Sequence, residues 1–97
     1  VKFDYSEQAK SFVLKSLSEE TRRTYEIHLK EFFHFHNLKH PVNVTATDVI
    51  RWRDTLLKKG SRPATVTTKL SILRSFFEYL RASGVIELNP ASTKLVP

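Results

Sequence analysis

The chain has 97 residues, which is enough for one domain with a single modest core. Hydrophobic residues make up 40% of it and aromatic residues 11%, a composition that excludes an intrinsically disordered chain. The formal net charge of +6 predicts an anionic partner, which could be nucleic acid, a membrane surface or an acidic protein. Cysteine is absent from the sequence, so a disulfide framework and thiolate chemistry are excluded.

No apolar stretch approaches the ~20 residues that a membrane-spanning helix needs, and the N-terminus lacks the charged-then-apolar pattern of a secretion signal. We therefore expect a cytoplasmic protein with no membrane partner. The sequence begins with valine and contains no methionine. This indicates that the chain was trimmed from a longer one or lost its start residue.

Four helices and no sheet are predicted, because no segment alternates with period two for long and both glycines fall where helices should end. The first helix is expected over about Tyr5–Ser16. The second is expected over about Glu19–Asn37, with Ser18 as its N-cap. The fold class is therefore all-α.

The start of the third helix is well marked. Thr45 and Asp48 have the spacing of a capping box, and the helix is expected over about Ala46–Lys59. The fourth helix is predicted to begin after Ser61, with Pro63 in its first turn, where the missing N–H costs little.

Apolar residues at helical spacing predict the core. The candidate core positions are Tyr25, Leu29, Phe32, Phe33 and His36 on the second helix, Val49, Trp52, Leu56 and Leu57 on the third, and Val66, Leu70, Leu73, Phe77 and Leu80 on the fourth.

The segment after the fourth helix contains Asn89-Pro90, and proline disfavours helix at the preceding residue. We therefore expect a domain over residues 1–90 and the start of a linker over residues 91–97.

The fourth helix carries a second face beside its apolar seam. At about 100° per residue, small hydroxyl residues and a lysine fall on an adjacent arc that contains no acid. Its members are Ser61, Thr65, Thr68, Lys69 and Ile72. Short hydroxyl side chains allow close approach to phosphates and can donate to their oxygens. Arg62 at the helix start can reach a phosphate or a guanine edge.

A polar flank on the second helix is formed by Thr21, Thr24 and His28, with Arg23 long enough to reach a DNA backbone. These residues have plainer interpretations as well. Hydroxyls in first helical turns, such as those of Thr21 and Thr65, often serve only as local hydrogen-bond partners. A cation such as Lys59 at a helix end stabilises the helix dipole.

The order and spacing of four stretches carry a family resemblance. They are residues 18–21 with Tyr25 and Leu29, residues 45–57, residues 60–61 and 64–66 with 70–77, and residues 84–86 with 89–90. Together they resemble the N-terminal core-binding, SAM-like domain of tyrosine recombinases and phage integrases. The resemblance covers roughly residues 7 to 97.

The resemblance implies a four-helix orthogonal bundle that forms half of a clamp around duplex DNA, with the second and fourth helices against the major groove. It also implies neighbouring recombinase protomers as partners, and the first helix is a possible contact. The family's catalytic Arg, Lys, His, Arg and Tyr lie in a separate domain that this sequence does not resemble. We therefore expect DNA binding for integration and recombination, with no enzymatic activity of its own.

Family contacts carried over by motif position fall on Thr21, Arg23, Thr24, Ala64, Thr65, Thr68 and Lys69. Ala64 departs from the polar residue common there, which puts base recognition at that position in doubt, although alanine can contact a thymine methyl. The complete predicted DNA-binding set is Thr21, Arg23, Thr24, His28, Lys59, Ser61, Arg62, Ala64, Thr65, Thr68 and Lys69.

Catalytic and metal chemistry find no support in the sequence. Tyr25 is expected in the core, and Tyr79 lacks the electropositive cluster that a tyrosine nucleophile needs. His34 and His36 point about 200° apart on a helix and cannot easily share a metal. We expect no metal, no cofactor and no small-molecule substrate. The alternatives are a helical protein–protein interaction domain with a basic face and, less favoured, a fragment of an all-α enzyme.

Overall fold

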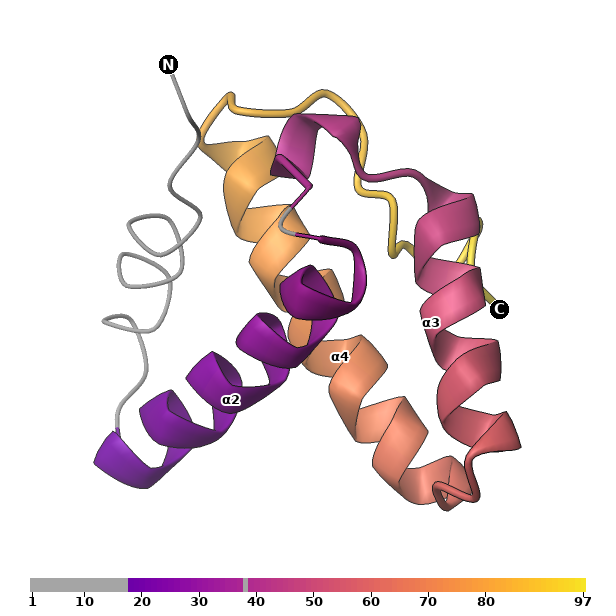
Figure 1. The fold of residues 1–97 in the computed structure, drawn as a ribbon. Helices are drawn as coiled ribbons and strands as arrows, with labels where there is room; N and C mark the ends of the chain where they lie inside the picture. The colour runs from indigo at the N-terminus through magenta and orange to yellow at the C-terminus, as the bar shows by residue number, and fades with distance from the viewer. Residues whose placement is uncertain (1–17, 38) are drawn as a thin grey trace.

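The computed structural model describes residues 18–37 and 39–97. Over these residues the elements are helix α2 (Glu19–Phe35), a short 3₁₀ helix η1 (Pro41–Asn43), α3 (Ala46–Lys58) and α4 (Pro63–Ala82) (Figure 1). The described ranges contain no strand, which confirms the all-α class. The helix expected over Tyr5–Ser16 lies outside the described residues, so the count of four helices stays a prediction.

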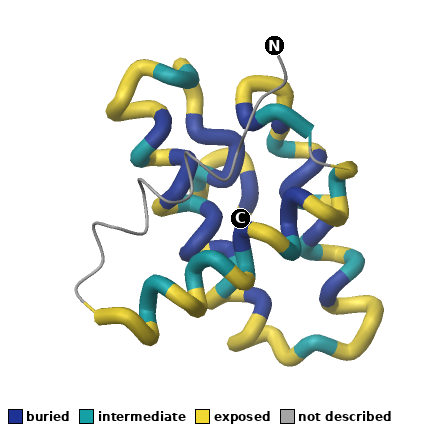
Figure 2. The backbone as a smooth tube through the Cα atoms, turned by 60° about the vertical axis from the view of Figure 1, so that its left-hand side comes forward, coloured by how far each residue is buried: buried dark blue, intermediate teal, exposed yellow. Residues whose placement is uncertain are grey.

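Helix α4 is the centre of the described fold. It packs against both α2 and α3, and the three helices enclose one hydrophobic core. In Figure 1, α2 and α4 approach each other toward the middle of the view and diverge toward their N-terminal ends. Figure 2 shows the buried positions along the inner sides of the helices and the exposed ones around the outside.

Aromatic rings join the three helices. Phe32 lies edge-on to Trp52 and to Phe77, with ring centroids 5.1 and 6.3 Å apart. Phe33 meets Phe76 edge-on at 5.9 Å. Edge-to-face pairs contribute about 0.5–1.5 kcal/mol each beyond the burial of their area. This cluster therefore fixes where α2 and α3 lie on α4.

The predicted core is largely confirmed, with three corrections. Leu57 is 42% exposed, because its neighbour Leu56 takes the inward position and the two point about 100° apart. Ile72, expected on the polar face, is only 5% exposed, and Phe76, absent from the predicted core, is fully buried. The burial of Ile72 and that of Phe76 have the same cause. Because two helices cover α4, it buries a wider arc than a single apolar seam.

The predicted N-caps are present. The Ser18 hydroxyl accepts from the Thr21 backbone N–H at 3.0 Å. Thr45 and Asp48 form the complete capping box at the start of α3. Helix α2 ends at Phe35, two residues earlier than expected, and Asn37 adopts a left-handed conformation with φ of 56°. The chain then turns into η1 and α3.

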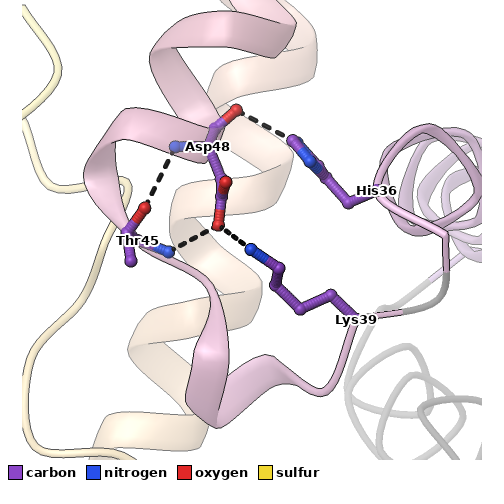
Figure 3. A network of polar contacts seen from close by, with 4 residues as sticks. All are labelled: His36, Lys39, Thr45 and Asp48. Carbon is purple, nitrogen blue, oxygen red and sulfur yellow. Dashed lines mark hydrogen bonds and ion pairs between the residues drawn. The ribbon is translucent and has the colours of Figure 1, made fainter.

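A polar network built around Asp48 fastens the end of α2 to the start of α3 (Figure 3). The buried Asp48 carboxylate accepts from the Thr45 N–H at 3.0 Å and from the Lys39 ammonium at 2.9 Å. The Asp48 carbonyl accepts from His36 Nε2 at 3.0 Å, which assigns the proton to that nitrogen. Burial alone would raise the pKa of Asp48, but the hydrogen bonds from Lys39 and Thr45 outweigh it and hold the pKa below its ordinary value.

The C-terminal segment packs on the helices. Arg74 Nε donates to the Ala91 carbonyl at 2.8 Å, and Asn89 Nδ2 donates to the Arg74 carbonyl at 3.0 Å. Ala91 and Val96 are fully buried. Residues 91–97, expected as the start of a linker, thus lie against the body of the domain, and the boundary at residue 90 stays a prediction.

None of the helices in the described part of the chain has the length and apolar character needed to cross a membrane.

We predict that Thr45→Ala lowers the free energy of unfolding by about 1–2 kcal/mol, because it removes the hydroxyl that caps the Asp48 N–H. Thr47→Ala is the matched control, since Thr47 is an exposed residue in the first turn of the same helix. Urea unfolding followed by circular dichroism measures both. Equal stability of the two variants would contradict the capping role.

A pH dependence follows from His36, whose pKa is lowered mainly because burial disfavours its charged form. The unfolded chain therefore binds this proton more readily than the folded chain. The contribution of neutral His36 to folding stability is complete above the ordinary pKa of 6.5, and it is lost as the pH falls from that value through the lower pKa of the folded chain. We expect the unfolding free energy of the wild type to fall more steeply between pH 7.5 and pH 5 than that of His36→Gln. His34→Gln, at an exposed position of α2, should follow the wild type; parallel curves for all three proteins would refute the assignment.

Candidate nucleic-acid interface

An open groove of about 460 Å³ lies between the first turns of α2 and the middle of α4. Seven of the nine residues that line it carry a hydroxyl group. The lining residues are Glu20, Thr21, Thr24, Tyr25, Thr67, Thr68, Ser71, Ile72 and Ser75. The groove brings together Thr21, Thr24 and Thr68 from the set predicted by sequence.

Sequence reasoning missed three small hydroxyl residues of α4 that line the groove. Thr67, Ser71 and Ser75 recur every four residues along α4 and so form one stripe of small hydroxyl side chains on its surface. The helical spacing could have revealed this stripe. It was overlooked because the polar face was assigned around Thr65 and Lys69, and only the packing of α2 shows which side of α4 borders a groove.

The groove threonines are locally bonded in the free chain. Thr24 Oγ1 donates to the Glu20 carbonyl and Thr68 Oγ1 to the Ala64 carbonyl, both at 3.1 Å. Thr21 Oγ1 accepts from the Ser18 hydroxyl at 2.6 Å. The local interpretation therefore holds for Thr21 in the free chain, and Thr24 and Thr68 have local partners as well. Their oxygens retain lone pairs, and a rotation about the Cβ–Oγ1 bond redirects the hydrogen at the cost of one exposed hydrogen bond.

A second group surrounds the α3–α4 turn. Lys59, Arg62, Ala64 and Thr65 are exposed and Ser61 is partly exposed. Arg62 is the N-cap of α4, and no side chain caps this helix start. The first turn of α4 therefore offers backbone N–H groups and the positive end of the helix dipole beside two cations, an arrangement suited to anions.

Lys69 lies in a third group with His28. Its ammonium is 2.8 and 2.9 Å from the two carboxylate oxygens of Glu31 and joins α4 to α2. His28 Nδ1 is 3.8 Å from the same carboxylate and makes no hydrogen bond within the described residues. Glu31 was not singled out from the sequence, although it stands three residues after His28 on the same flank of α2.

Arg23 is exposed on α2 but does not line the groove. The predicted set therefore divides into three groups, which lie at the groove, at the α3–α4 turn and around the Glu31 carboxylate. Arg23 belongs to none of them. In the described ranges, no three His, Cys, Asp or Glu side chains are grouped so that they could hold a metal ion.

The fold and the groove define a small all-α domain with a net positive charge and a hydroxyl-lined cleft between two helices. The family model described as "Phage integrase, N-terminal SAM-like domain" matches residues 11–84. The chain belongs to this family, as the resemblance in its sequence indicated.

Curated relatives carry one printed name, tyrosine recombinase XerC. The protein from Thermodesulfovibrio yellowstonii is 40% identical over 77 residues, covering 79% of this chain and 25% of the relative. The protein from Vibrio vulnificus is 34% identical over 86 residues, covering 86% and 27%. The protein from Chlorobaculum tepidum is 30% identical over 92 residues, with the same coverages. The chain thus spans about a quarter of the length of these relatives. No solved structure matches the chain.

We predict that the double substitution Thr24→Ala/Thr68→Ala changes the free energy of unfolding by less than about 0.5 kcal/mol. Each substitution removes only a bond to the fourth preceding carbonyl at an exposed site, and alanine has the higher helix propensity. Thermal unfolding measured beside Thr45→Ala gives the comparison. A loss above about 1 kcal/mol would mean that these hydroxyls serve the fold rather than a ligand.

Proposed function

We propose that this domain binds double-stranded DNA as the core-binding domain of a tyrosine recombinase, holding one recombination half-site. The observation that carries the proposal is the hydroxyl-lined groove between α2 and α4. Small hydroxyl side chains let a phosphate backbone come close to a helix and offer it hydrogen bonds.

The α3–α4 turn supplies the positive charge. Lys59 and Arg62 contact phosphates in this proposal, and the uncapped start of α4 directs its N–H groups toward the same backbone. Ser61 and Thr65 donate to phosphate oxygens from the first turn. Ala64 contacts a thymine methyl where the duplex comes closest to α4.

In the same proposal, strand breaking and rejoining are performed by a catalytic domain outside these 97 residues, toward which residues 91–97 lead. Neighbouring protomers assemble beside this domain on the DNA, and the protein works in the cytoplasm, on the nucleoid. The isolated domain binds DNA with modest affinity, because it lacks the avidity that two linked DNA-binding domains have together.

Fluorescence anisotropy with a labelled duplex tests DNA binding. We expect the wild type to bind at 50 mM salt and to weaken steeply at 200 mM, with a log–log slope near −4 if about four to five phosphates are neutralised. The triple variant Arg62→Ala/Thr65→Ala/Thr68→Ala should bind at least about tenfold more weakly, because it loses one phosphate charge and two hydroxyl donors.

Arg51→Ala is the matched control, since it removes the same charge from an exposed position of α3, away from the groove. It should retain most of the affinity of the wild type. A folded wild type that ignores the duplex at 50 mM salt would overturn the proposal. Equal competition by an acidic peptide would instead favour a protein partner for the basic face.

A further inference from the structure

Lys69, which sequence reasoning assigned to DNA contact, is already paired with a carboxylate. The Lys69 ammonium lies 2.8 and 2.9 Å from the two oxygens of Glu31, so one cation and one anion neutralise each other across α2 and α4. His28 stands beside the same carboxylate at 3.8 Å. The predicted phosphate ligand is therefore engaged before any DNA arrives.

The pair is partly buried. The Lys69 side chain is only 13% exposed and that of Glu31 34% exposed. Fully exposed ion pairs are weakened by solvent and by salt, whereas screening is smaller for a partly buried pair. A phosphate that approaches Lys69 must therefore compete with a carboxylate that holds its position even at moderate salt.

Glu31 lies on the same face of α2 as the groove residue Thr24, although neither Glu31 nor Lys69 lines the groove itself. Thr24, His28 and Glu31 follow one another at intervals of four and three residues, so they share one face of the helix. Thr24 lines the groove. The sequence of α4 up to Phe77 carries no acid, so on the α4 side nothing opposes a phosphate. Glu20 lines the groove without an ion pair to a lysine in the described residues, whereas Glu31 holds the Lys69 ammonium.

We propose that Glu31 limits the DNA affinity of this domain by holding the Lys69 ammonium in a neutral pair beside the α2–α4 groove. This inference rests on the proposed DNA binding. Removing the charge of Glu31 frees Lys69 for a phosphate, while the glutamine amide oxygen still accepts a hydrogen bond and keeps α2 joined to α4. Glu31 is a positioning residue here, because it acts on DNA through Lys69.

The test compares Glu31→Gln with Glu20→Gln in the same anisotropy assay. Glu20 lines the groove itself, and within the described residues it forms no ion pair with a lysine. Both substitutions raise the net charge by one, so their difference isolates the release of Lys69 from the general loss of repulsion. We expect Glu31→Gln to bind the duplex roughly fivefold more tightly than Glu20→Gln, with a salt slope steeper by about 0.9, the contribution of one more phosphate.

A double variant completes the cycle. Glu31→Gln/Lys69→Gln should lose the gain, because the freed ammonium is its source. Circular dichroism of each variant shows that it is folded. Equal binding by Glu31→Gln and Glu20→Gln overturns the inference, and so does a gain in affinity that survives the loss of Lys69. In either case the proposed function stands as long as the wild type binds the duplex. Absence of duplex binding by the wild type and every variant at 50 mM salt overturns both.

Discussion

Burial of α4 between α2 and α3 is the constraint on which the described structure depends. Edge-to-face contacts from Phe32 and Phe33 to the α4 rings Phe76 and Phe77 fix where α2 lies, and Trp52 brings in α3 through Phe32. A helix covered on two sides has only the remaining arc left for polar side chains. The hydroxyl stripe of α4 occupies that arc, so the same packing that builds the core also defines the groove.

Two polar contacts also hold the helices together, and they join different pairs of helices. The Asp48 network ties the end of α2 to the start of α3 at the opposite end of α2 from the groove, and all its members are satisfied within the fold. The Glu31–Lys69 pair joins α2 to α4 beside the groove and is partly open to solvent. The first is thus suited to stability alone, whereas the second can be disturbed by a charged ligand.

The C-terminal segment adds a third attachment. Arg74 on α4 donates a hydrogen bond to the backbone carbonyl of Ala91. Proline and a nearby glycine mark the exit from α4 in the sequence, but they do not say where the chain goes afterwards. Val96 is nevertheless fully buried, which the local sequence does not predict.

Local signals in the sequence were enough for the class and the helix starts. The apolar spacing of α4 and the capping residues Ser18, Thr45 and Asp48 act on residues within about one helical turn. Their effect can therefore be predicted from the local sequence. Membership of the phage-integrase family is likewise a property of residue order and spacing. The tertiary structure decided what depends on contacts between helices: that Ile72 is buried, that Ser71 and Ser75 border a groove, and that Lys69 meets Glu31, 38 residues away. Such pairings follow from how helices cross, and the crossing is set by the shapes of the packed side chains rather than by any local pattern.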